Sequence, residues 1–171
     1  MKIRGMFFLY GSIMLLPAGL FCQSSAAVQS ANSTPPYPII TSYTCFFLPI
    51  VSTNNKTTTW NFSNTFSIGF LTGITILYSD KFGFSFDLGP VITATGGTSK
   101  VSNFIFDPGP IFRFKKGYAL ITRIAFETAG RFGESTVLSK VFTPPKKNSL
   151  FVALEIPIRF GNNLPPSIGA T

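Results

Sequence analysis

Two glutamates, each on a strand-like segment with an arginine four residues away, come nearest in this chain to a catalytic arrangement. Glu127 follows Arg123, and Glu155 precedes Arg159. Two carboxyl groups in one cleft could act as general acid and general base in glycoside hydrolysis. We favour a structural interpretation, because each glutamate shares a strand face with an arginine and no substrate cleft is implied. The sequence therefore predicts no catalytic residue.

The composition excludes most other catalytic groups. The chain has 171 residues and no histidine, which excludes a Ser-His-Asp triad, a Cys-His dyad and a His-ligated zinc. The glycine-rich run at residues 96–100 lacks the Gly-Lys-Ser/Thr order of a phosphate loop and is typical of a turn. We predict that the protein is not an enzyme and has no cofactor and no metal site.

The N-terminus has the three parts of a secretory signal peptide. A basic start precedes an apolar stretch at residues 6–22, and small residues that suit the signal peptidase follow. We predict a signal peptide over residues 1–27 and a Ser/Asn/Pro-rich leader over 28–38. Cys22 invites a second interpretation as a lipidated cysteine, although the bulky Phe21 before it matches such a site poorly.

Charge and aromatic content together suggest a membrane. Charged residues are 12% of the chain, about half the usual share of a soluble domain, while the aromatic share is 15% and includes 20 phenylalanines. Lys+Arg number 14 against 6 Asp+Glu, but the basic residues are scattered and a secreted chain has little access to nucleic acid. We expect membrane lipid, including anionic glycolipid, as the partner and no nucleic acid.

A two-residue alternation of apolar with small or polar residues is the strongest structural signal. In residues 82–94 the even positions are apolar, as at Phe84 and Phe86, while the odd positions include Ser85 and Asp87. This period is typical of β-strands, and a helix would not gather these residues on one stripe. Clear alternation also occupies residues 62–78, 104–115, 118–129 and 150–160, and weaker segments occupy 39–51 and 135–143. We count seven strands and expect an eighth within residues 52–61 or in the leader.

The residue types on the two faces indicate which face is enclosed. The polar face is mostly Gly, Ser, Ala and Thr, which fit inside a narrow closed barrel, whereas a solvated sheet surface is usually rich in larger polar residues. The charges share this small-residue face in near balance. The predicted interior polar network is Asp87, Asp107, Arg113, Arg123, Glu127, Glu155 and Arg159.

The phenylalanines occupy the opposite face, and several lie near strand ends, where a lipid-facing barrel carries its aromatic girdle. The predicted lipid-facing residues are Phe84, Phe86, Phe104, Phe106, Phe112, Phe114, Phe126, Ile156, Ile158 and Phe160.

The signal peptide, the alternating strands and the Phe-rich face together resemble the small outer-membrane β-barrel proteins of Gram-negative bacteria. The resemblance implies an all-β, up-and-down antiparallel transmembrane β-barrel of about eight strands over residues 39–160, followed by a C-terminal tail over 161–171. It also implies that the outer-membrane assembly machinery is a partner, since that machinery reads the aromatic end of the last strand, here residues 150–160.

The expected function is that of an outer-membrane barrel at the cell surface, with a side-chain-filled interior and a structural or surface-interaction role, because about eight strands leave no room for a general pore. The alternative is a soluble β-barrel or sandwich, periplasmic or secreted, that binds an apolar ligand in a Phe-lined interior. In that alternative the phenylalanines point inward and the charges meet water.

Overall fold

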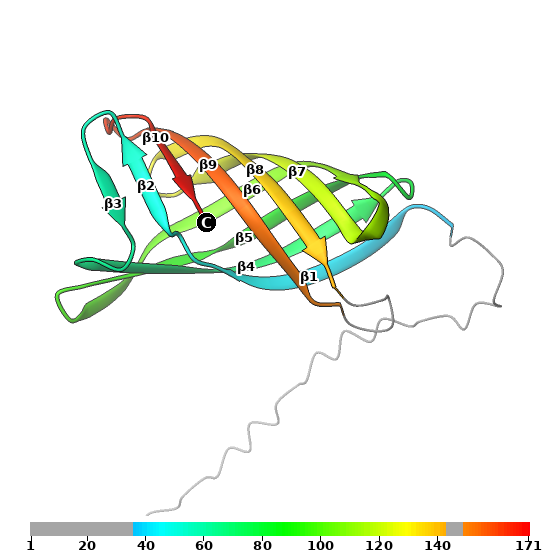
Figure 1. Cartoon of the computed structure of the whole chain (residues 1–171), viewed down its shortest axis with the longest axis horizontal. Coiled ribbons are helices and arrows are strands. Elements are labelled where there is room, and N and C mark those ends of the chain that lie inside the picture. Colours follow the sequence, from blue (N-terminus) through cyan, green and yellow to red (C-terminus); the bar gives the residue numbers. More distant parts are fainter. Residues whose placement is uncertain (1–35, 143–148) are drawn as a thin grey trace, which may run out of the picture. The chain divides into compact units, whose positions relative to one another are not determined.

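A computed structural model describes residues 36–142 and 149–171, which form antiparallel β structure (Figure 1). They belong to one compact unit. The predicted signal peptide, Cys22 and most of the predicted leader lie outside the described residues. The strands are β1 (Ile39–Phe47), β2 (Val51–Asn54), β3 (Thr58–Trp60), β4 (Thr65–Leu77), β5 (Phe82–Thr95), β6 (Thr98–Arg113), β7 (Tyr118–Glu127), β8 (Arg131–Val141), β9 (Phe151–Gly161) and β10 (Ser167–Ala170), with one 3-10 turn, η1 (Lys115–Gly117), between β6 and β7.

The strands form one curled sheet in the order β1-β4-β5-β6-β7-β8-β9-β10-β2-β3. Strands β4 to β9 each pair with the next strand in the chain, and every pair is antiparallel. Figure 1 shows the long strands tilted and wrapped around a common interior. The predicted all-β antiparallel fold is therefore confirmed, in a half-barrel sheet of ten strands where about eight were expected.

Each of the seven predicted segments overlaps one long strand, although β6 and β8 begin earlier than predicted, and the three further strands are short. β2 and β3 occupy the region where an eighth strand was expected. The prediction of one strand over residues 39–51 was wrong, because β1 ends at Phe47 and a break at Leu48-Pro49-Ile50 follows. Pro49 has no N–H to donate to a ladder. β10 lies in the predicted tail and is too short to show alternation.

Alternate residues of the long strands face the concave interior. In β7, Ile121 and Arg123 are buried, whereas Ile124 and Phe126 are 59% and 51% exposed. Successive side chains of a strand point to opposite sides of a sheet, so one parity of β4 to β8 builds the interior. The apolar core on this side consists of Leu77, Ile111, Ala119, Ile121 and Val137.

Glycines on the concave side allow close approach of neighbouring strands. A Cβ at Gly109 in β6 would overlap the carbonyl oxygen of Thr122 in β7, and a Cβ at Gly133 in β8 would overlap that of Ile158 in β9. Any other residue would push these main chains apart. These glycines of the small-residue face are therefore required for the close approach of the neighbouring strands.

Asn61, directly after β3, connects the two ends of the sheet. Its Nδ2 donates to the carbonyl oxygen of Ser67 at 2.8 Å, and its Oδ1 accepts from the Ser67 N–H at 2.6 Å. Ser67 lies in β4, next to the edge strand β1, while β3 is the other edge. These two bonds hold both edges near β4.

We predict that Asn61→Ala lowers the free energy of unfolding by about 1–3 kcal/mol, because both Ser67 main-chain groups lose a partner. Denaturant unfolding followed by the fluorescence of Trp60, the single tryptophan, measures the change. Asn64→Ala is the matched control, since Asn64 is exposed nearby and its loss should cost no more than about 0.5 kcal/mol. Equal stability of the two variants would contradict the role given to Asn61.

Candidate functional site in the interior of the sheet

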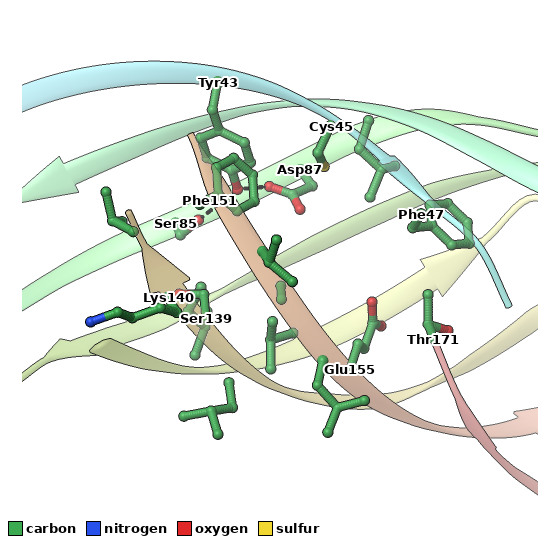
Figure 2. Close-up of a pocket in the computed structure, with 18 of the residues that line it drawn as sticks. Tyr43, Cys45, Phe47, Ser85, Asp87, Ser139, Lys140, Phe151, Glu155 and Thr171 are labelled. Carbon is green, nitrogen blue, oxygen red and sulfur yellow. Dashed lines mark hydrogen bonds between the residues drawn. The ribbon is translucent and has the colours of Figure 1, made fainter. Parts of the chain in front are cut away.

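A buried ion pair between Arg123 and Asp87 forms the centre of a first polar cluster. Arg123 Nη1 lies 2.8 Å from Asp87 Oδ2, and the two side chains are 6% and 2% exposed. Arg123 Nη2 donates to Tyr43 Oη at 2.8 Å and to Ser85 Oγ at 3.2 Å. The Tyr43 hydroxyl donates to Asp87 Oδ1, and Figure 2 shows the Tyr43, Ser85 and Asp87 side chains pointing toward one another. Strands β1, β5 and β7 thus share one network.

Two glycines explain how side chains from strands that do not pair can meet. Gly73 in β4 is the partner of Tyr43 on one side and of Asp87 on the other, and a Cβ there would overlap both side chains. Gly109 in β6 is the partner of Ser85 and lies against the Arg123 backbone. Each glycine leaves the space through which a side chain reaches across the intervening strand.

Arg159 forms the second cluster with strands β7, β8 and β9. Its Nε lies 2.7 Å from Glu127 Oε1, and its Nη2 lies 3.8 Å from Glu155 Oε1. Nη2 also donates to Ser135 Oγ at 3.0 Å. Both glutamates that raised the question of acid-base chemistry therefore contact one arginine, as members of structural ion pairs.

Of the two pairs that a spacing of four residues within a strand suggests, Glu155 with Arg159 is formed, whereas Arg123 and Glu127 each have another partner. Arg123 and Glu127 share a face of β7, but residues four apart in a strand are separated by about 13 Å along it. Arg123 therefore pairs with Asp87, and Glu127 pairs with Arg159. The shortest ion pair of each arginine is therefore with a carboxylate two strands away.

Five of the seven predicted interior residues form these two clusters, and two do not. Arg113 is exposed, because it is the last residue of β6 and lies where the strand leaves the interior. Asp107 is 2% exposed and is the cross-strand partner of Asp87. Its Oδ1 has no hydrogen-bond partner among the described residues.

Tyr43 and Arg131 belong to the interior network but are absent from the predicted set. Arg131 Nη2 donates to Ser167 Oγ at 2.9 Å and to the carbonyl oxygen of Arg159 at 3.0 Å, so it joins β8 to β10. Tyr43 lies in a segment that is apolar on both faces, and Arg131 lies between the predicted strand segments 118–129 and 135–143. Both have the odd parity of Arg123 and Arg159, which is the signal that could have identified them.

The ten residues predicted to face lipid have the outward parity, and eight of them are exposed while Phe86 and Ile158 are half-buried. Four phenylalanines on β6 to β9 are successive cross-strand partners, and we call them the Phe row: Phe106, Phe126, Phe132 and Phe160. Phe82 and Phe112 pair near the other ends of their strands, with ring centroids 5.5 Å apart. The outward surface therefore carries aromatic rings toward both ends of the strands.

Two cavities inside the sheet share Phe47 in their walls. The larger has a volume of about 940 Å³, lies against β1 and β9, and is lined mainly by apolar side chains together with Asp87 and Arg123. The smaller has a volume of about 370 Å³ and is lined by apolar and polar residues, the latter including Asp107 and Arg159. Arg123 and Asp87 thus border the larger cavity and Glu127 and Arg159 the smaller one, while Glu155 lines both.

Comparisons of the chain with protein-family models, with curated proteins and with solved structures find no match. Within residues 36–142 and 149–171, no helix is long and apolar enough to cross a membrane. The same residues contain no group of three or more His, Cys, Asp or Glu placed to hold a metal ion. The fold and the interior define an all-β protein with a curled antiparallel sheet and a charged concave face.

We predict that Arg123→Ala destabilises the protein by about 3–5 kcal/mol, because it leaves Asp87 buried without its counter-charge. Arg113→Ala removes the same side chain from an exposed position and should change stability by no more than about 0.5 kcal/mol. Denaturant unfolding of both variants measures the difference. A loss of stability for Arg113→Ala as large as that for Arg123→Ala would refute the assignment.

Proposed function

We propose that the protein is a small outer-membrane β-barrel of a Gram-negative bacterium, with a structural or surface-interaction role and neither enzymatic activity nor general pore function. The outward face of the sheet carries the proposal. Large apolar side chains cover that face and remain exposed, whereas the ion pairs lie on the concave side. A soluble domain arranges these classes of residue the opposite way.

The strand lengths and the aromatic rings support a position in the bilayer. β7, β8 and β9 have 10, 11 and 11 residues, and a tilted transmembrane strand needs about 9–11. In water the Phe row would be part of a large exposed apolar patch, while in lipid it lies in its preferred solvent.

The outward charges of β8 are compatible with this position. Glu134 and Lys140 lie toward the two ends of the strand, where the cost of a charge on the lipid face falls to about 0–1 kcal/mol for a basic residue and less for an acidic one. Lys140 Nζ lies 4.1 Å from the centroid of the Tyr118 ring, a contact that suits the aromatic belt at an interface.

The interior supports a role other than bulk diffusion, because side chains from β1, β5 and β7 meet across it. The larger cavity favours a second candidate, a secreted or periplasmic β-barrel that binds an apolar ligand. Phe47 and Phe151 line that cavity, but the Phe row faces outward, and for this reason we rank the soluble protein second. Under the first proposal the partners are membrane lipid, including anionic glycolipid, and the outer-membrane assembly machinery.

Cell fractionation tests the location. We expect the full chain, expressed in a Gram-negative host, to sediment with the outer membrane and to migrate differently on a detergent gel before and after boiling, since a folded barrel resists the detergent until it is heated. Recovery of all the protein in the soluble periplasmic extract would exclude the membrane barrel.

A lysine substitution on the outward face tests whether that face is surrounded by lipid or by water. Leu88 is 50% exposed on β5, and Leu88→Lys should cost about 2–4 kcal/mol of folding free energy in a bilayer if this position lies near the midplane. Ala94→Lys, on the same outward face near the end of β5, is the control and should cost about 0–1 kcal/mol. Unfolding in lipid vesicles measures both, and equal small effects would favour a surface in water.

A further inference from the structure

We propose that the larger cavity binds the acyl chain of a single-chain amphiphile such as a fatty acid, which enters sideways between β1 and β9 and places its polar end at Arg123. This inference rests on the proposed function, because a surrounding bilayer supplies the ligand and the route. It adds to that function a defined ligand class and a site.

The route is the seam between β1 and the first residues of β9. In the described part of the chain, β1 pairs with β4 alone, and main-chain bonds from β9 to the C-terminal strand begin at Glu155. Residues 151–154 of β9 pair with β8 on one side, and their other backbone edge faces the seam. The rings of Tyr43 and Phe151 meet across it with centroids 5.8 Å apart, as Figure 2 shows. β1 and this part of β9 are therefore joined by contacts between side chains and not by a hydrogen-bonded ladder.

The cavity walls continue from the interior to the outward surface. Leu71, Ile121 and Val137 line it and are buried, while Phe46, Val152 and Leu154 line it and are 70%, 60% and 51% exposed. A cavity lined by residues of both faces passes through the sheet at the seam. Its volume of about 940 Å³ lies within the range of small-molecule sites, about 300–1,000 Å³, and its walls match an unbranched hydrocarbon.

Arg123 provides the polar end of the site. It lines the cavity and is 5% exposed, and its Nε is a buried donor with no acceptor among the described residues. The Nη1 group is already paired with Asp87, so the free donor requires an oxygen acceptor. The carboxylate of a fatty acid or the carbonyl of an ester supplies that oxygen, whereas a plain hydrocarbon does not.

Binding of stearic acid carrying a spin label near its methyl end tests the site. The full chain is placed in phosphatidylcholine bilayers, and the spectrum separates motionally restricted from free label. We expect a saturable restricted component of one label per protein that unlabelled stearic acid displaces and that octadecane displaces at least about tenfold less well, a difference of about 1.4 kcal/mol.

A matched pair of tryptophan substitutions on β7 separates the cavity from the outer surface. Ile121→Trp fills the cavity and should weaken binding at least about tenfold, whereas Ile124→Trp enlarges an outward side chain and should change it by less than about twofold. Absence of a saturable component, or equal weakening by both variants, overturns the proposal.

Two further measurements test the site if the Ile121→Trp variant does not fold. The gel shift on heating identifies folded protein, and Val137→Phe fills the same cavity from β8. In the unsubstituted chain, Cys45 lines the cavity, so stearic acid should slow its reaction with a maleimide, with Cys45→Ser giving the background. If the protein is bound to the membrane but stearic acid neither slows the maleimide reaction of Cys45 nor gives a restricted spin-label component, the ligand site alone is overturned. Protein found in the soluble extract overturns the membrane assignment instead.

Discussion

Pairing of buried charge is the constraint on which the rest of this structure depends. The concave face encloses Arg123 and Arg159, and each requires a carboxylate within reach because an unpaired ion in such a place is strongly destabilising. The nearest partners come from other strands, Asp87 for Arg123 and Glu127 for Arg159, and Glu155 of the same strand is a second partner of Arg159. A slip of one residue in any of these strands would turn its charge outward and its phenylalanines inward. The ion pairs and the outward apolar surface therefore select the same register.

The long strands were predictable because a period of two appears in each of them. β4 to β8 present one parity to the interior, as the alternation of Gly, Ser and Ala with Phe and Ile indicates. β2, β3 and β10 were not predictable as strands, since three or four residues do not reveal a period. Their place in the sheet depends on pairing between distant parts of the chain.

The site was only partly predictable, for a related reason. Parity assigns Asp87, Arg123, Glu127 and Arg159 to one face but does not say which charge meets which. The partners depend on how tightly the sheet curls, and Gly73 and Gly109 determine this by allowing side chains to cross an intervening strand. Tyr43 enters the network over Gly73; its parity assigns it to the interior face, but its segment is apolar on both faces and does not distinguish it from a core aromatic residue. The cavity beside it follows from the unpaired seam, which no local pattern encodes.

Residues 39–54 pair at both ends of the sheet, and this has a consequence for the order of assembly. The first part of the segment, β1, pairs with β4, which is synthesised soon afterwards. The second part, β2, pairs with β10, more than a hundred residues later. The β1–β4 pairing closes a short loop, whereas the β2–β10 pairing closes a loop of more than a hundred residues and costs more conformational entropy. We therefore expect the β1–β4 pairing to form first and docking of residues 167–170 between β9 and β2 to complete the sheet.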